Sequence, residues 1–280
     1  MFDFTSSDDV IIQVHEWPVD GPARGIVQIA HGMGEHAARY AHVARTLNAA
    51  GFHVYAADHR GHGTSMHAGP GVIGDDGWNL LVADQVTLIG LLRQRHPDLP
   101  LVLLGHSLGS FASQQLVLDH SDLVDALALS GTTAVDQLLN SLVNDGPDVL
   151  AQFNTAFEPV RTESDWLSRD PAQVDLYLAD PWCGFSLDDA GMGDLIAAGA
   201  RFPAVETVRE DLPIYVLVGS MDPLNQKLTW SDLAVQRYRD AGIADVTYRV
   251  YEDARHEVLN ETNRDEVEGE LVAWLDRVIG

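Results

Sequence analysis

The sequence predicts an α/β fold in which a mostly parallel central sheet is flanked by helices. Short, nearly continuous apolar runs alternate with helical patterns along the chain, as is typical of strands that are buried on both faces of a parallel sheet. One long stretch, residues 133–206, interrupts this alternation and contains no clear buried strand. We therefore expect a core formed by residues 1–132 and 207–280, with residues 133–206 inserted as a mostly helical cap (lid).

The individual elements follow from the hydrophobic periodicity. Residues 10–17 alternate between apolar and polar side chains, which predicts a half-exposed antiparallel strand. Buried strands are expected at residues 25–30, 54–57, 101–104, 126–129, 214–218 and 246–251. Helices are expected at residues 38–50, 79–95, 108–119, 226–241 and 264–278. Helical crossovers between parallel strands would place these helices on the two faces of the sheet.

The composition is that of a folded and strongly acidic protein. Of the 280 residues, 46% are hydrophobic, and 17 Lys and Arg stand against 42 Asp and Glu, which gives a formal charge of −25. This charge disfavours nucleic acid and anionic membranes as partners. Because no apolar run could span a bilayer and no signal peptide is visible, we expect a cytoplasmic protein without stable membrane insertion. The single cysteine, Cys183, excludes an internal disulfide and a cysteine-cluster metal site.

A nucleophile is predicted at Ser107. Residues 105–109 read GHSLG, the pattern G-x-S-x-G, directly after a buried strand and directly before a helix. The small residues Gly105 and Gly109 allow the sharp turn that projects the serine hydroxyl above the sheet. The N-terminus of the following helix would present N–H groups to a developing negative charge. The alternative interpretation is a purely structural turn.

A serine nucleophile requires a base, and the base requires an acid that orients it. The expected chain order is serine, acid, histidine. Asp222 and His256 each follow a predicted strand and should lie at the same edge of the sheet as Ser107. No histidine other than His256 follows His120 in the sequence. Asp253 is the rival candidate for the acid.

The oxyanion hole requires two N–H donors. One is expected from Leu108, the residue after the nucleophile, and the other from Met33 in the glycine-containing loop HGMGEH. Glu35 and His36, which belong to the same loop, are expected to anchor it rather than to react.

Other polar residues near these motifs are assigned structural roles. Residues 58–62 are expected to hold a loop by hydrogen bonds and a buried ion pair rather than to bind a metal. His106 should pack beside the nucleophile, and Cys183 should pack within the cap. Glu257 and Glu252 are interpreted as surface residues that point away from the base. The cap aromatics either form a small core of their own or also bind substrate in an acyl tunnel; the candidates are Trp166, Trp182 and Phe185.

These motifs resemble those of the α/β-hydrolase fold, specifically its monoglyceride lipase and bacterial lysophospholipase-like branch. The resemblance rests on HGMGEHAARY at 31–40, DHRGHGTS at 58–65 and GHSLGS at 105–110. It implies that residues 133–206 are the family's cap. Met33 stands where the family has a small residue, and we expect it to narrow the acyl pocket. The resemblance also implies a triad of Ser107, Asp222 and His256, with Met33 and Leu108 supplying the oxyanion hole.

The residues and the resemblance together predict a serine carboxylic-ester hydrolase that needs neither a cofactor nor a metal. The expected substrate is a monoacylglycerol or another short- to medium-chain acyl ester. A lysophospholipid is the alternative, with Arg161, Arg169 or Arg201 of the cap as the partner of its phosphate. An aminopeptidase or a carbon–carbon bond hydrolase would use the same triad. From a different class, a non-catalytic binding protein could share the fold.

Overall fold

A computed structural model describes residues 1–145 and 153–280 of the chain and contains an eight-stranded sheet with the order β1-β2-β4-β3-β5-β6-β7-β8. The first two strands pair antiparallel, and every other pairing except β2 with β4 is parallel. The fold class predicted from the sequence is therefore confirmed. The strands are β1 (Phe2–Thr5), β2 (Ile11–Trp17), β3 (Gly25–Ala30), β4 (Phe52–Ala57), β5 (Leu101–His106), β6 (Ala126–Ser130), β7 (Ile214–Gly219) and β8 (Val246–Tyr251).

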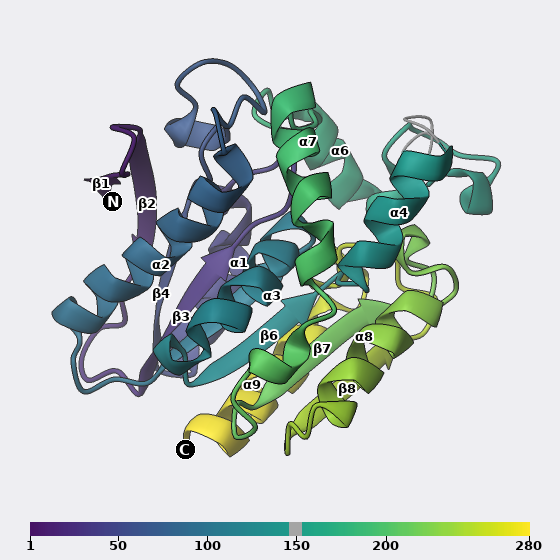
Figure 1. Cartoon of the computed structure of the whole chain (residues 1–280). Helices are drawn as coiled ribbons and strands as arrows, with labels where there is room; N and C mark the ends of the chain where they lie inside the picture. The colour runs from purple at the N-terminus through teal and green to yellow at the C-terminus, as the bar shows by residue number, and fades with distance from the viewer. Residues whose placement is uncertain (146–152) are drawn as a thin grey trace.

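Helices cover both faces of the sheet and create two hydrophobic cores (Figure 1). The helices α2 (Gly77–Arg95), α3 (Leu108–His120) and α8 (Thr229–Asp240) pack on one face. The other face is covered by α1 (Ala41–Ala49) and α9 (Arg264–Ile279). Alternate residues of a strand enter opposite cores, so a strand buried on both faces becomes a continuous apolar run. In β5, Leu103 belongs to the first core and Leu104 to the second.

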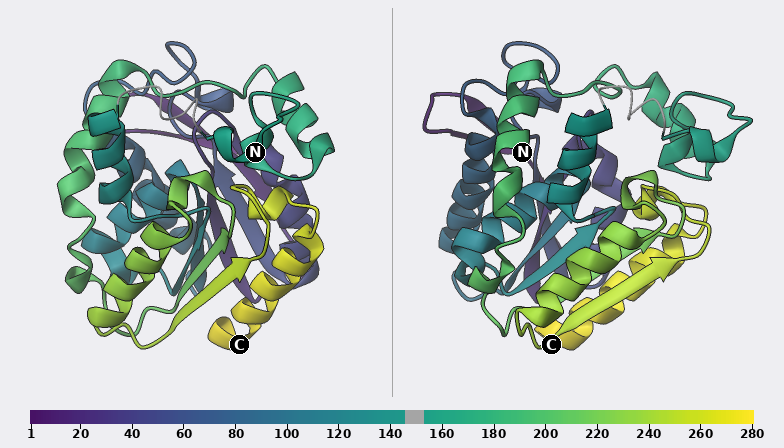
Figure 2. Two further views of the ribbon diagram at one scale, coloured as in Figure 1. Left: turned by 90° about the vertical axis from the view of Figure 1, so that its right-hand side faces the viewer. Right: turned by 45° about the vertical axis from the view of Figure 1, so that its right-hand side comes forward.

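The segment between β6 and β7 contains helices and no strand in the part that the structure describes. Its longer helices are α4 (Val135–Asp145), α6 (Pro171–Ala179) and α7 (Asp189–Ala198). Asp170 and Asp188 cap the last two, since each side chain accepts a backbone N–H of the first turn. The segment crosses one end of the sheet in both views of Figure 2. Short 3-10 helices within it are η4 (Thr155–Phe157), η5 (Asp165–Leu167), η6 (Gly199–Arg201) and η7 (Val205–Thr207).

The structure modifies some of the predicted boundaries. The helix predicted at 38–50 begins as the 3-10 helix η1 (Ala37–Tyr40), and the one predicted at 226–241 begins only at Thr229. Residues 226–228 all have positive φ, which no helix accommodates. Strand β1 was not predicted, because four residues with alternating exposure carry little signal. The remaining 3-10 helices are η2 (Gly63–Ser65), η3 (Ser121–Leu123), η8 (Pro223–Asn225) and η9 (Val258–Asn260).

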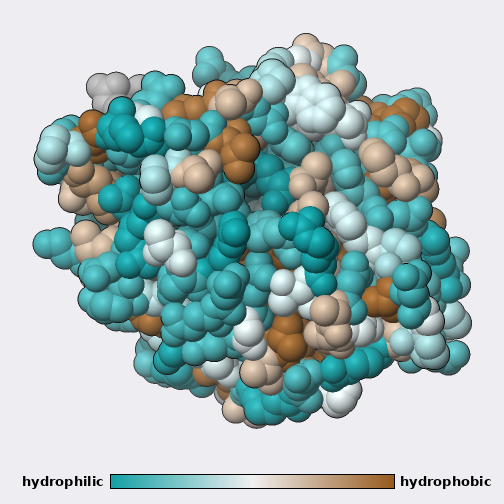
Figure 3. Space-filling model, turned by 180° about the vertical axis from the view of Figure 1, so that it is seen from behind, coloured by the Kyte–Doolittle hydropathy of each residue, from teal (hydrophilic) through white to brown (hydrophobic). Residues whose placement is uncertain are grey.

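The surface is mainly hydrophilic on the face seen from behind, where hydrophobic residues form only small, scattered patches (Figure 3). Within residues 1–145 and 153–280, no helix combines the length and the apolar character that a membrane crossing requires.

Candidate active site

Ser107 occupies the turn between β5 and α3 in a strained conformation, with φ 50° and ψ −121°. The turn is held by the Ser107 N–H, which donates to the carbonyl of Ser130 at 3.0 Å, and by the Ser110 hydroxyl, which donates to the Ser107 carbonyl at 2.6 Å. A Cβ atom at Gly109 would lie 2.1 Å from the carbonyl oxygen of Ala30, so only glycine lets α3 begin this close to β3. The predicted strand–turn–helix context is therefore present, and Ser107 lines a cavity at this edge of the sheet.

Asp222 and His256 meet at the same edge. The Nδ1 atom of His256 lies 3.0 Å from Oδ2 of Asp222, and both side chains are buried. The Asp222 carboxylate also accepts the Leu224 N–H at 2.9 Å, which fixes its orientation. Asp253 is exposed and donates its backbone N–H to the Ser220 hydroxyl. The geometry thus favours Asp222 over Asp253 as the orienting acid.

The charge of Asp222 controls the protonation of His256. Burial alone disfavours the imidazolium, but the attraction and the hydrogen bond of the adjacent carboxylate outweigh it. The pKa of His256 consequently lies above its ordinary value. An imidazole of this kind is a stronger base, and its cationic form is stabilised when it takes up a proton.

The two predicted oxyanion donors belong to residues that line the same cavity as Ser107 and His256. Leu108 is the first residue of α3, where backbone N–H groups have no partner within the helix. Met33 belongs to the loop after β3. The residue that follows Met33, Gly34, has φ +62°. A Cβ atom at Gly34 would lie 2.1 Å from the carbonyl oxygen of Phe185, so glycine lets the loop pass directly against the segment from 133 to 206.

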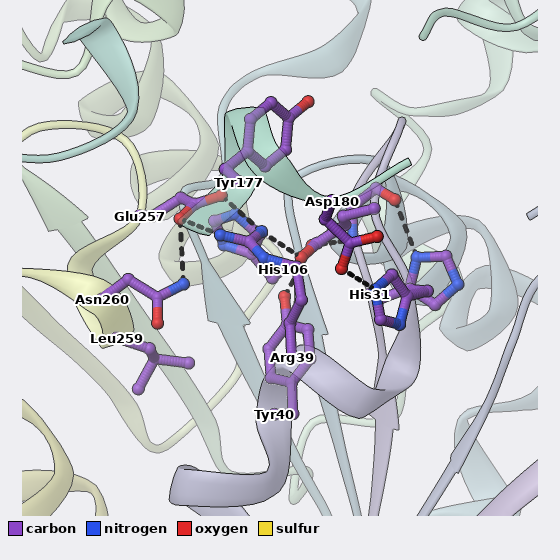
Figure 4. A network of polar contacts seen from close by, with 12 residues as sticks. His31, Arg39, Tyr40, His106, Tyr177, Asp180, Glu257, Leu259 and Asn260 are labelled. Atoms are coloured by element: carbon purple, nitrogen blue, oxygen red, sulfur yellow. Dashed lines mark hydrogen bonds and ion pairs between the residues drawn. The ribbon is translucent and has the colours of Figure 1, made fainter. Parts of the chain in front are cut away.

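A buried ion-pair network supports this loop, and Arg39 lies at its centre (Figure 4). The guanidinium group donates to Glu35 at 2.5 Å and to both carboxylate oxygens of Glu257 at 2.7 and 2.8 Å. Burial raises the pKa of each carboxyl group, but Arg39 outweighs it and keeps both pKa values below the ordinary range. The surface position predicted for Glu257 is wrong, since this residue is only 4% exposed. Its partner is 218 residues away, and no local pattern announces the pairing.

The same network extends to the loops on both sides of the cavity. Glu35 accepts the Gly32 N–H at 2.5 Å and the Tyr40 hydroxyl at 2.8 Å. Glu257 accepts the Asn260 side-chain amide at 2.9 Å. Arg39 thus connects the loop of Met33 to the loop of His256. Glu35 anchors the first loop, as the sequence predicted.

His106 packs between the two loops without being a candidate base. Its ring centroid lies 4.9 Å from that of His256, and its Nδ1 is 3.2 Å from the Ser130 hydroxyl. Burial and the neighbouring His256 lower the pKa of His106 to about 4. The ring is therefore neutral near neutral pH, in agreement with the packing role predicted for it.

The cavity above Ser107 has a volume of about 350 Å³ and a mainly apolar lining. Two of the three predicted cap aromatics line it, namely Trp166, whose ring lies 5.1 Å from that of His256, and Phe185. Trp182 does not line it: the side chain is 42% exposed and packs edge-on against His36. The apolar wall is completed by Phe111, Leu138, Leu139, Leu142, Phe153, Leu167, Leu178, Met192, Leu195 and Leu224.

The arginines considered as phosphate ligands do not face this cavity. Each forms an ion pair elsewhere, and no lysine or arginine contributes to the lining within the ranges that the structure covers. The pairs are Arg161 with Asp175, Arg169 with Glu261 and Arg201 with Asp119.

Residues 58–62 form the structural cluster that the sequence predicted. Arg60 is fully buried and pairs with Asp84 and Asp8, each at 2.8 Å. The Asp58 carboxylate accepts the backbone N–H groups of Ala37 at 2.8 Å and Thr64 at 2.7 Å. These bonds fix the loop after β4 against the loop after β3.

Comparisons with known proteins show which family the chain belongs to. A monoacylglycerol lipase of Mycolicibacterium smegmatis is 34% identical to this chain, and the match covers 97% of this chain and 95% of the lipase. The monoglyceride lipase of Mus musculus is 30% identical, and the match covers 86% of this chain and 78% of that lipase. The crystal structure of a thermostable carboxyl esterase from Bacillus coagulans superposes with a TM-score of 0.88 at 28% identity, covering 100% of this chain and 98% of the other. The resemblance to α/β-hydrolases is confirmed. Because the Hydrolase_4 family model, described as serine aminopeptidase, S33, matches residues 21–263, the chain belongs to that family.

Proposed function

We propose that this protein is a serine ester hydrolase that acts on monoacylglycerols through an acyl-enzyme. The observation that carries the proposal is the apolar cavity of about 350 Å³ that has Ser107 and His256 in its wall and no cation in the described lining. An acyl chain fits an apolar wall, and a neutral glycerol headgroup needs no charged partner. The names of the relatives, two of them lipases of monoacylglycerols, support the same substrate class.

The chemistry follows from the positions of the residues. Ser107 Oγ attacks the ester carbonyl while His256 takes its proton, and Asp222 stabilises the imidazolium that forms. The oxyanion is bound by the N–H groups of Met33 and Leu108. His256 then protonates the departing glycerol, and a water molecule that it activates releases the fatty acid.

Residues 133–206 act in this proposal as a cap that selects the substrate. This segment supplies most of the apolar wall, including Trp166 and Phe185, whereas the triad candidates come from the core. Selection by chain length would therefore reside in the cap and bond cleavage in the core.

The first experiment tests the nucleophile with a fluorophosphonate probe and with hydrolysis of monoacylglycerol. Ser107→Ala should abolish labelling and lower kcat by roughly 10³-fold or more, since triad members act as a unit. Ser186→Ala is the matched control, because Ser186 also lines the cavity and should keep both activities. Labelling of the folded Ser107→Ala protein at another serine would contradict the assignment.

The second experiment separates the substrate classes by comparing monoacylglycerol, lysophosphatidylcholine and amino-acid p-nitroanilides. A neutral ester should give the highest kcat/KM, because the cap arginines are occupied by acidic partners. An aminopeptidase is the second candidate, because Glu163 is an exposed carboxylate at the cavity and could bind an α-amino group. Faster cleavage of anilides, lost in Glu163→Gln, would favour the aminopeptidase.

A further inference from the structure

Three side chains with metal-ligating atoms meet where the loop after β3 contacts the turn after α6. They are His36, Asp180 and Cys183, and one ligand atom from each lies within 4.8 Å of the others. The Nε2 atom of His36 is 2.8 Å from Oδ2 of Asp180, whose carboxylate appears beside the ion-pair network in Figure 4. We propose that these residues form a binding site for a divalent cation of the zinc class, distinct from the esterase site.

The donor set determines the class of cation. Imidazole nitrogen, thiolate sulfur and carboxylate oxygen are the ligands that Zn²⁺ takes, whereas Mg²⁺ and Ca²⁺ select oxygen alone. One thiolate and one carboxylate neutralise the two charges of the ion. Three protein ligands leave the fourth tetrahedral position to water.

The protons balance when the cation enters. The Cys183 thiol loses its proton to solvent as the sulfur–metal bond forms, and Asp180 binds as the carboxylate. His36 binds through Nε2, and its ring proton moves to Nδ1. That atom is buried and has no hydrogen-bond partner within residues 1–145 and 153–280. The hydrogen bond between His36 Nε2 and Asp180 Oδ2 is replaced by the bonds of these ligands to the metal. Binding therefore releases one proton for each cation.

Backbone hydrogen bonds hold the three proposed ligands near one another. The Cys183 N–H donates to the Asp180 carbonyl at 3.1 Å and the Trp182 N–H to the Asp180 carboxylate at 2.9 Å, so the turn already places two ligands side by side. The Gly184 N–H donates to the Gly34 carbonyl at 3.0 Å and holds this turn against the loop of His36. His36 is 6% exposed, whereas the Asp180 side chain is 31% exposed, which leaves a path for the ion.

The position of the site gives binding a structural consequence. His36 is three residues from Met33 in the sequence, and Met33 lines the cavity. The other two ligands, Asp180 and Cys183, shortly precede Phe185 in the sequence, and Phe185 also lines the cavity. A bound cation would join the oxyanion loop to the segment that lines the acyl cavity. Because the ligands come from two parts of the chain, the ion binds the folded state and raises Tm. The sequence does not predict this metal site, because positions 36, 180 and 183 become neighbours only in the fold.

The experiment titrates Co²⁺, as a spectroscopic substitute for Zn²⁺, into the metal-free full chain. Because Cys183 is the only cysteine, the charge-transfer absorption of a Co²⁺–thiolate bond reports this residue alone. We expect saturation at one equivalent in the wild type, displacement by Zn²⁺, and no band in Cys183→Ser. Asp180→Asn and His36→Gln should each weaken binding by about tenfold or more. Asp175→Asn, which removes an exposed carboxylate from the helix α6 that precedes the site, is the control and should bind as the wild type does.

Two results would overturn the proposal. One is the absence of a thiolate band at millimolar Co²⁺. The other is unchanged affinity in Asp180→Asn, which would show that the thiol binds the ion without its neighbours. Circular dichroism and Tm of each variant are recorded first, and Asp180→Asn decides the outcome if His36→Gln does not fold.

Discussion

Replacing Arg39 with methionine removes the cation that lies between two buried carboxylates. Glu35 is 2% exposed and Glu257 is 4% exposed, so water cannot take over the role of the guanidinium. Removing one partner of a buried ion pair typically costs about 3–5 kcal/mol, because an uncompensated charge is left behind. We expect the low end of this range, about 3 kcal/mol, since both carboxylates keep neutral hydrogen-bond donors such as Gly32 and Asn260.

The loss in the free energy of unfolding caused by Arg39→Met should be larger at neutral pH than at acidic pH. In the wild type, the pKa values of Glu35 and Glu257 lie below their ordinary value of 4.5. These groups therefore stabilise the folded state fully at pH values above 4.5. They lose this contribution as the pH falls through their pKa values in the folded protein. Without Arg39 only burial and the neutral donors remain, and burial raises the pKa of a carboxyl group. The difference in the free energy of unfolding should therefore be largest near neutral pH and shrink as the pH falls toward 4.5.

The assay is urea unfolding of the wild type and Arg39→Met at pH 7 and at pH 5. Arg277→Met is the matched control: Arg277 forms an equally short ion pair with Asp245 but its side chain is 51% exposed, so we expect a cost below about 1 kcal/mol. The reasoning fails if Arg39→Met loses no more stability than Arg277→Met, or if its loss is the same at both pH values.

Two further predictions concern the site. Asp222→Asn should lower kcat by on the order of 10²- to 10⁴-fold and move the acidic limb of kcat/KM to lower pH, because the pKa of His256 loses the carboxylate that raises it. Asp253→Asn should change neither quantity, and the opposite ranking in a pH–rate series would transfer the acid role to Asp253. Trp166→Ala should alter the preference among p-nitrophenyl esters of increasing chain length by about 1–3 kcal/mol, whereas the exposed Trp182 should be replaceable by alanine without effect. Equal profiles for both variants, compared at equal folded fraction, would remove Trp166 from the acyl site.

The parts of the fold that could be predicted are those whose physical cause is local. Strands β3, β5 and β7 are buried along their whole length, and burial on both faces produces the apolar runs that identify them. The sharp turn at Ser107 could be predicted because it requires small neighbours within two residues. The contact between Asp222 and His256 could be predicted because the loops that follow parallel strands lie at one edge of the sheet.

The remaining features depend on which segments the fold brings together. Glu35 and Arg39 are four residues apart, a spacing that usually indicates an exposed pair on a helix. Here the pair is buried because Glu257 arrives from the histidine loop and the Tyr177 ring lies 5.0 Å from the guanidinium carbon. Trp182 is the converse case, since this large apolar side chain is left exposed where it packs against His36.

The loop at 31–40 therefore links functions that the sequence presents as separate. It carries Met33 at the cavity, Glu35 in the ion-pair network and His36 against Asp180. The turn at 180–184 cannot move away without breaking both the bond between His36 and Asp180 and the bond from the Gly184 N–H to the Gly34 carbonyl. Because both bonds lie within three residues of Met33, a displacement of this turn must either be absorbed by the loop or change the position of a proposed oxyanion donor. In the proposed mechanism, the position of the turn at 180–184 and the binding of the oxyanion are for this reason coupled through bonds that lie outside the proposed triad.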